Sequence, residues 1–163
     1  MSQGNLVQFF PHGMQQPLNF YAALELASAG VPVFPCDPKT KAPTVNGGFK
    51  SATTDENQVI AWFSFTKSIG VPMGEITCLD IDAKHQPNLI EDFEAAINEA
   101  GLTDLLNSLP KQTTMNGGCH FFARVEGMPE PIKNLKFAKN ADKETTIETR
   151  GKGGYVITTP SEG

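Results

Sequence analysis

Residues 76–82, Ile-Thr-Cys-Leu-Asp-Ile-Asp, form the segment that most constrains how this chain can fold. An apolar, β-branched run that ends in polar residues is typical of a buried β-strand. Because side chains alternate along a strand, Asp80 and Asp82 point to one face while Leu79 and Ile81 point to the other. Two adjacent carboxylates repel each other unless a cation lies between them, and Mg²⁺ or Mn²⁺ prefers such oxygen ligands. The pair indicates either a metal site or a solvated strand end.

The composition is that of a globular protein with no membrane segment. Of the 163 residues, 39% are hydrophobic and 19% are charged, which is enough for one domain with a core. The sequence has no apolar run long enough to span a bilayer and no signal segment. Cys36, Cys78 and Cys119 are widely spaced and form no Cys-x-x-Cys pair. They favour free thiols in a cytoplasmic protein and argue against a zinc site built on cysteine.

The charge is distributed unevenly along the chain. The net charge of −5 does not indicate a nucleic-acid-binding protein. Residues 54–110 carry ten acidic and two basic side chains, whereas residues 111–152 carry eight basic and five acidic ones. The second half is therefore the candidate for a locally basic surface, although ordinary solvated lysines would give the same count.

The first half predicts a helix, short strands and a lysine-bearing loop. Residues 1–16 show no periodic pattern and are expected to form an N-terminal arm. Helical spacing, turn residues and short apolar runs then predict a helix between Pro17 and Gly30, an edge strand at 31–36, a loop at 37–50, a helix that starts at Thr54, and a strand at 69–73.

The second half predicts two more helical segments and two hairpins. Its patterns predict a helix at 89–100 closed by Gly101, a short helical segment at 102–109, a hairpin of strands 111–115 and 119–125 around Asn116-Gly117-Gly118, a loop at 126–142, and a closing hairpin of strands 145–150 and 155–159. We therefore expect residues 17–163 to form one α+β domain.

Three predicted strands carry polar residues where core residues are usual. They are the Asp80 and Asp82 pair, His120 and Glu148. A single histidine on a strand is more often structural, and a single glutamate more often faces solvent. Together, however, three carboxylates from two strands can hold two divalent ions, which clamp the attacking and leaving oxygens of a phosphoryl transfer.

Groups that suit a bound nucleotide accompany these acids. His120, Arg150 and Lys152 would neutralise a triphosphate. The glycine turns that contain Gly118 and Gly153 would let the backbone approach a nucleotide closely.

Three spaced motifs give this chain a recognisable pattern. They are Leu79-Asp-Ile-Asp82, then Asn116-Gly-Gly-Cys-His120, then Ile147-Glu-Thr-Arg-Gly-Lys-Gly-Gly-Tyr-Val156 with Thr159-Pro-Ser161. In this order they resemble the primase-polymerase (prim-pol) family of the archaeo-eukaryotic primase superfamily. The likeness runs from about Phe20 to Ser161. Many members of that family form the N-terminal part of phage or plasmid replication proteins.

The resemblance implies a fold, a site and an activity. The fold would be an α+β prim-pol fold with mixed sheets, an RRM-like catalytic subdomain and an active-site cleft. Asp80, Asp82 and Glu148 would be the catalytic, metal-binding acids for Mg²⁺ or Mn²⁺. His120 would contact the nucleotide phosphates, and Arg150 is a candidate phosphate contact. The activity would be template-directed addition of nucleotides to a 3′-hydroxyl, as in a DNA primase or DNA polymerase.

The implied partners are nucleoside triphosphates, a single-stranded DNA template and a primer. Family members usually continue beyond the Pro-Ser pair, often into a helicase domain, so we expect this chain to be a fragment. Asn116 stands where the family usually has Ser or Thr, Cys119 where it often has a basic residue, and Glu148 where it more often has Asp. Two alternatives remain open, namely a metal-dependent nuclease and a non-catalytic nucleotide- or DNA-binding module of a replication initiator.

Overall fold

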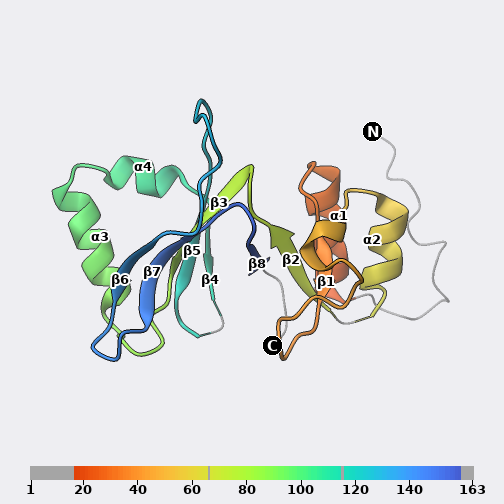
Figure 1. Ribbon diagram of the computed structural model, residues 1–163, viewed down its shortest axis with the longest axis horizontal. Coiled ribbons are helices and arrows are strands. Elements are labelled where there is room, and N and C mark those ends of the chain that lie inside the picture. Colours follow the sequence, from red (N-terminus) through yellow and green to blue (C-terminus); the bar gives the residue numbers. More distant parts are fainter. Residues whose placement is uncertain (1–16, 66, 115, 159–163) are drawn as a thin grey trace.

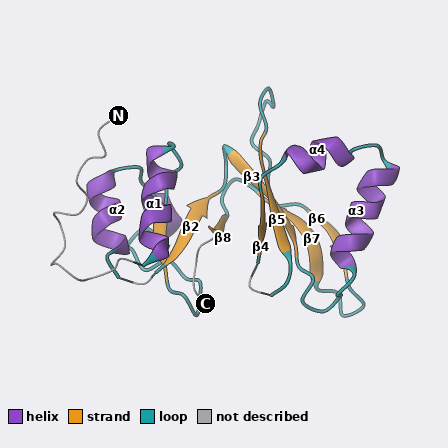
Figure 2. Ribbon diagram, turned by 180° about the vertical axis from the view of Figure 1, so that it is seen from behind, coloured by secondary structure: helices purple, strands orange, loops and turns teal. Residues whose placement is uncertain are grey.

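The computed structural model of the protein describes residues 17–65, 67–114 and 116–158. The predicted N-terminal arm of residues 1–16 and the Pro-Ser end of the third motif lie outside the described residues. Two bodies, each a sheet with helices, lie next to each other along the longest axis of the molecule (Figure 1, and from behind in Figure 2). The last described strand returns to the body in which the described chain begins.

The smaller body is a three-stranded antiparallel sheet on which two helices pack. Its strand order is β1-β2-β8, and its elements are α1 (Leu18–Ser28), β1 (Phe34–Cys36), the 3₁₀ turn η2 (Gly48–Ser51), α2 (Glu56–Phe63), β2 (Ser68–Pro72) and β8 (Tyr155–Thr158). Phe20, Val59, Phe63 and Ile69 are buried in its core. β1 is an edge strand, as its prolines predict.

The larger body is a five-stranded sheet with two helices. Its strand order is β4-β5-β3-β7-β6, and its elements are β3 (Ile76–Ile81), α3 (Leu89–Glu99), α4 (Thr103–Ser108), β4 (Lys111–Thr113), β5 (Cys119–Arg124), β6 (Lys136–Lys139) and β7 (Thr145–Arg150). The strands β7-β3-β5-β4 form the RRM-like part, with β3 and β5 in the middle.

Strand pairing in both bodies is antiparallel throughout the described residues, so the expectation of mixed sheets is wrong. Two consecutive strands can pair in parallel only if the connection between them crosses over the sheet, so that the second strand lies beside the first in the same direction. Here α3 and α4 lead from β3 to β4, and β4 pairs with β5 instead of with β3. The predicted α+β class is confirmed.

Local signals explain where the helices begin and end. The Asp55 carboxylate accepts the backbone N–H of Gln58 at 2.8 Å and caps α2, one residue later than the predicted start at Thr54. Gly101 follows α3 with a φ of +71°, a left-handed conformation that favours glycine. The segment at 102–109 contains the short helix α4, as predicted.

The alternation of side chains along β3 separates a covered face from an open one. Leu79 and Ile81 pack with Phe93 of α3 and Phe121 of β5 in the second core. Asp80, one residue away from each, therefore points to the opposite face of the sheet. This division was predicted from the sequence, and it places the acid on the face that α3 and α4 leave open.

The prediction of a loop at residues 126–142 is wrong in part, because residues 136–139 form the strand β6. β6 lies at the edge of the larger sheet, and both Lys136 and Phe137 are exposed. An edge strand with neither face buried shows no apolar alternation, and lysines on such a strand discourage pairing with other chains. The sequence pattern of β6 is therefore that of a loop.

The closing hairpin predicted for residues 145–159 is also wrong. β7 pairs with β3 and β6 in the larger sheet, whereas β8 pairs with β2 in the smaller one. Alternation predicts that a strand exists and which face it buries, but it does not identify the partner strand. The glycine turn between β7 and β8 carries the chain from one sheet to the other and joins the two bodies.

The segment before β6 holds this crossing turn in place. The backbone N–H of Lys152 donates to the carbonyl of Ile132, and the N–H of Gly151 donates to Oδ1 of Asn134, both at 2.8 Å. A Cβ on Gly151 would overlap the carbonyl oxygen of Ile132 and lie 2.7 Å from its carbonyl carbon. Gly151 is therefore required for a close backbone approach.

Gly151→Ala is expected to lower the free energy of unfolding by about 1 to 3 kcal/mol, because the added methyl group meets backbone that cannot move aside alone. Gly74→Ala is the matched control, since a Cβ there meets no atom within 4 Å. The control should change stability by less than about 0.5 kcal/mol. Urea denaturation followed by circular dichroism measures both variants. Equal stability of the Gly151→Ala and Gly74→Ala variants would contradict the close approach of the backbone at Gly151 to Ile132.

Candidate active site

A row of polar side chains crosses the larger sheet on its open face. The register places Lys136 opposite Glu148, Glu148 opposite Asp80, Asp80 opposite His120, and His120 opposite Gln112. Residues directly opposite each other in an antiparallel sheet share a face, with their Cβ atoms about 5 Å apart. The strand order thus brings together Asp80, His120 and Glu148, three site residues that were predicted from distant parts of the sequence.

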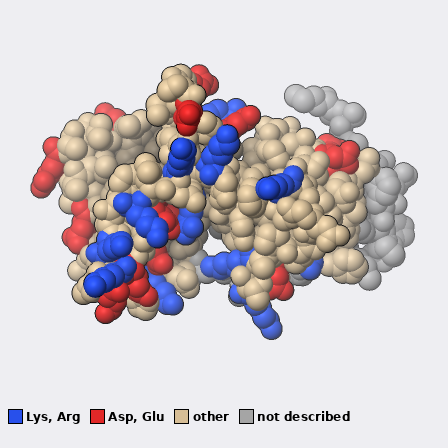
Figure 3. All heavy atoms as spheres, viewed as in Figure 1, with Lys and Arg blue, Asp and Glu red and all other residues tan. Residues whose placement is uncertain are grey.

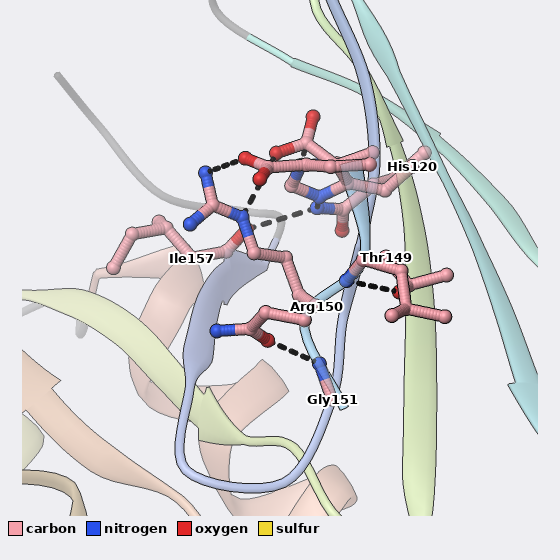
Figure 4. A network of polar contacts seen from close by, with 10 residues as sticks. His120, Thr149, Arg150, Gly151 and Ile157 are labelled. Carbon is pink, nitrogen blue, oxygen red and sulfur yellow. Dashed lines mark hydrogen bonds and ion pairs between the residues drawn. The ribbon is translucent and has the colours of Figure 1, made fainter. Parts of the chain in front are cut away.

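Arg150 provides the positive charge between the two acids of this row. It lies two residues after Glu148 on β7 and so points to the same face. Its Nε is 3.3 Å from Oδ2 of Asp80, and its Nη2 is 2.5 Å from Oε1 of Glu148 (Figure 4). The guanidinium therefore occupies the position between the carboxylates where a cation is required.

Asp80 has partners on both sides. His120 Nε2 is 3.4 Å from its Oδ1, opposite the contact with Arg150. Burial raises the pKa of Asp80, but the hydrogen bond from His120 and the charge and hydrogen bond of Arg150 outweigh burial and hold the pKa below its ordinary value. The Asp80 carboxylate is thus stabilised in its charged form although its side chain is only 18% exposed.

Asp82 lies outside this row. It follows the last residue of β3, and its side chain is exposed. Its Oδ1 accepts the backbone N–H of Lys84 at 3.1 Å. Asp82 nevertheless lines the same cavity as Asp80, so two of the three predicted acids face a common space.

The donor chemistry of the site suits a hard divalent cation, but its present arrangement is not a finished metal site. Asp80, Asp82 and Glu148 supply only carboxylate oxygens, which Mg²⁺ and Mn²⁺ prefer. Within the described residues, however, no three His, Cys, Asp or Glu side chains are gathered in a way that could hold a metal ion. Two of the carboxylates share Arg150 instead.

A cavity of about 570 Å³ lies between the two bodies, over this site. The larger sheet contributes Asp80, Gln112, His120 and Arg150 to its lining. The smaller body contributes β8 and the aromatic ring of Phe49. Tyr155 of β8 lies 6.0 Å from the Phe49 ring, centroid to centroid. The cavity therefore has a charged side and an aromatic side, a combination that suits a ligand with a polar and a ring-containing part.

Two of the predicted nucleotide-binding residues lie elsewhere. Lys152 is exposed on the crossing turn, and neither it nor Gly118 is among the described residues that line the cavity. A Cβ on Gly118 would overlap the carbonyl oxygen of Ile81. The glycine at position 118 therefore lets the backbone pack closely against the end of β3. This close contact is within the protein and not with the nucleotide that the sequence pattern suggested.

Sequence reasoning missed two residues that organise the site. Gln112 contacts His120 and β8, and Asn134 accepts the N–H of Gly151 at the crossing turn. The only available signal for Gln112 was its position in a predicted strand, and Asn134 lies in a segment predicted as loop. Neither a position in a strand nor a position in a loop identifies a functional residue unless the pairing of the strands is also known.

The sequence matches the family described as bifunctional DNA primase/polymerase, N-terminal (Prim-Pol), over residues 23–163. The chain belongs to the Prim-Pol family. The predicted resemblance is confirmed, and the match covers both bodies and the cavity between them. A comparison with curated proteins finds no match.

Membership of the Prim-Pol family indicates a primase/polymerase role in replication, with nucleotides and DNA as substrates. Enzymes of this family are typically metal-dependent, and the structure is consistent with an α+β prim-pol fold built on two antiparallel sheets. None of the helices among the described residues of this Prim-Pol chain has the length and apolarity needed to cross a membrane.

The lowered pKa of Asp80 predicts how the free energy of unfolding depends on pH. A carboxylate whose pKa is lowered by folding adds stability above its unfolded pKa of about 3.9, and this contribution is lost as the pH falls through the folded pKa. Asp80→Asn should therefore lower the free energy of unfolding by about 1 to 3 kcal/mol at pH 7, the range for hydrogen bonds to charged groups. The difference from wild type should shrink below about pH 4.

Urea denaturation at several pH values, in the presence of a chelator, measures this difference. Asp142→Asn is the control, because Asp142 is exposed on the turn between β6 and β7. That substitution should change stability by less than about 0.5 kcal/mol at any of these pH values. A difference between wild type and Asp80→Asn that stayed constant down to pH 2 would show that the charge of Asp80 is not stabilised.

Proposed function

We propose that the cavity binds a nucleoside triphosphate and that this Prim-Pol domain adds nucleotides to a primer 3′-hydroxyl under the direction of a DNA template. The observation that carries the proposal is the cross-strand row of His120, Asp80 and Glu148 beside the cavity, with Arg150 between the acids. Family membership supports the same reaction class. The protein would act in the cytoplasm, in the replication of a phage, plasmid or similar element.

The cavity has the size and chemistry for a nucleotide. Its volume of about 570 Å³ falls within the usual range for small-molecule sites, about 300 to 1,000 Å³. The base and sugar would lie toward the aromatic side, where Phe49 and Tyr155 form the wall. The phosphates would lie toward Arg150 and His120.

Arg150 and His120 would bind the triphosphate through hydrogen bonds. A guanidinium presents two parallel N–H donors that match a phosphate, so Arg150 can exchange the carboxylates of Asp80 and Glu148 for phosphate oxygens. His120 would donate from Nε2, the nitrogen that faces Asp80. Arg150 would neutralise negative charge on the phosphates, and the two groups together would hold the nucleotide in one orientation.

Asp80, Asp82 and Glu148 would hold Mg²⁺ or Mn²⁺ once Arg150 binds phosphate. The cavity lining contains two acids, Asp80 and Asp82, and two basic side chains, Lys41 and Arg150. These charges cancel, so the lining alone does not attract a polyanion such as a triphosphate, and divalent cations would supply the missing positive charge. When bound, the divalent ions would lower the pKa of the 3′-hydroxyl and neutralise the departing pyrophosphate.

A basic surface near the site supports binding of a single-stranded template and primer. Several Lys and Arg side chains lie over β6 and β7, with Asp and Glu side chains among them (Figure 3). Lys136, Phe137 and Lys139 of β6 are all exposed. Positive charge interleaved with an aromatic ring is a common surface for single-stranded nucleic acid. A helicase domain in a longer protein would supply the unwound template.

The second candidate is a non-catalytic nucleotide-binding module. The observation that favours it is the pairing of Arg150 with Asp80 and Glu148, which leaves these acids occupied. Such a module would hold a nucleotide through Arg150 and His120 without a metal ion. The nuclease alternative has no comparable support, because the family is described by its primase/polymerase activity.

Calorimetric titration with dATP in the presence of Mn²⁺ tests the proposal directly. Wild type should bind the nucleotide only with the metal, and Asp82→Asn should weaken binding at least tenfold, about 1.4 kcal/mol. Asp82 is chosen because its side chain is exposed, so the substitution should not disturb folding. Release of pyrophosphate on addition of a primed template then tests for chain extension.

Asp104→Asn is the matched control, since Asp104 is exposed on α4 and does not line the cavity. Its affinity for dATP should equal that of wild type. Nucleotide binding that survives both chelation and Asp82→Asn would instead identify the binding module. Cleavage of the primed template without nucleotide consumption would identify a nuclease.

A further inference from the structure

Gln112 of β4 connects the two bodies at the site. Its side-chain Nε2 lies 2.7 Å from Nδ1 of His120 and donates to the carbonyl oxygen of Ile157 at 2.9 Å (Figure 4). Its Oε1 accepts the hydroxyl of Thr158 at 2.9 Å. Ile157 and Thr158 belong to β8 in the smaller sheet, whereas His120 belongs to β5 in the larger one.

These contacts determine which end of the Gln112 amide faces the histidine. A backbone carbonyl only accepts hydrogen bonds, so the atom of Gln112 that contacts Ile157 is the nitrogen. An amide nitrogen carries two hydrogens, and one of them points to Ile157. The same nitrogen contacts Nδ1 of His120, which therefore receives the second hydrogen and must be an acceptor.

We propose that Gln112 is a positioning residue that keeps Nδ1 of His120 as a hydrogen-bond acceptor and so places the ring proton on Nε2. This inference rests on the proposed function for its consequence, namely that the nucleotide phosphates meet an N–H donor. An imidazole carries one proton in its neutral form, so an acceptor at Nδ1 leaves Nε2 as the donor. Nε2 is the nitrogen that faces the Asp80 carboxylate, 3.4 Å away.

The opposite tautomer would place a lone pair of electrons at Nε2. That lone pair would repel the Asp80 carboxylate in the free protein and a phosphate oxygen in the nucleotide complex. The His120 ring is also fixed in orientation, because its side chain is 10% exposed and meets the Phe122 ring edge to face at 5.9 Å. Gln112 thus selects the proton position on a ring whose orientation is already set.

Nuclear magnetic resonance of the imidazole nitrogens tests the proposal. Long-range ¹H–¹⁵N correlation distinguishes a protonated ring nitrogen from an unprotonated one. At about pH 8, above the ordinary histidine pKa of about 6.5, His120 in wild type should carry its proton on Nε2. Loss of signals in His120→Asn assigns them, and the exposed His85 is an internal control whose spectrum should not change.

Gln112→Glu has nearly the same shape but cannot donate to Nδ1. The new carboxylate accepts a hydrogen bond, so the proton of His120 should move to Nδ1, and dATP with Mn²⁺ should bind at least tenfold more weakly than to wild type. Gln112→Met removes the donor without adding a charge. That variant should show a larger fraction of the Nδ1-protonated tautomer than wild type, because only Asp80 then favours the proton on Nε2. Its affinity should be intermediate, and it replaces Gln112→Glu if the glutamate variant does not fold.

A proton on Nδ1 in wild type, or the same tautomer in wild type and both Gln112 variants, would overturn the proposal. The spectra are recorded without nucleotide and without metal, so they decide the role of Gln112 independently of catalysis. Failure of wild type to bind dATP would overturn the proposed function, and the tautomer of His120 would still be measured.

Discussion

The Arg150 guanidinium between Asp80 and Glu148 is the interaction on which the arrangement of the site depends. The side chains of these acids are 18% and 14% exposed, and they stand directly opposite each other on adjacent strands. Like charges in that position destabilise a sheet unless a cation compensates them. Arg150 lies on the same strand as Glu148, two residues further on, so the strand that brings the second acid also brings its compensating charge. The site can therefore exist in a folded protein before any ligand binds.

The crossing turn makes the fold and the cavity inseparable. β7 places Glu148 and Arg150 on the larger sheet, and after the four-residue turn 151–154 β8 places the opposite wall on the smaller one. Gly151 allows the backbone to pass beneath Ile132 at this crossing. Gln112 also joins the two sheets, through side-chain hydrogen bonds to β8. The walls of the cavity are thus fixed relative to each other by two chain connections, from β2 to β3 and from β7 to β8, and by the hydrogen bonds of Gln112.

The sequence alone predicts the individual strands that carry the site better than it predicts which strands pair with each other. The run from residue 76 to 82 predicts β3 and the face of Asp80, because apolar alternation is a local property. The partners of a strand depend on register and topology, which local patterns do not contain. For that reason the closing hairpin was predicted wrongly, and Gln112 was not recognised although it lies opposite His120. β6 was missed for a different reason, since an exposed edge strand with lysines lacks the apolar signal altogether.

Under the proposed function, metal binding and nucleotide binding are coupled through Arg150. In the free protein the guanidinium satisfies Asp80 and Glu148, so a metal ion that takes these carboxylates leaves Arg150 without its anions. A bound triphosphate would supply new anions to Arg150, and a bound metal ion would supply a new cation to the acids. Each ligand therefore removes the cost that the other imposes, which is the thermodynamic condition for positive coupling between two sites. By the same reasoning either ligand alone would bind weakly, because Arg150 and the two acids already neutralise each other.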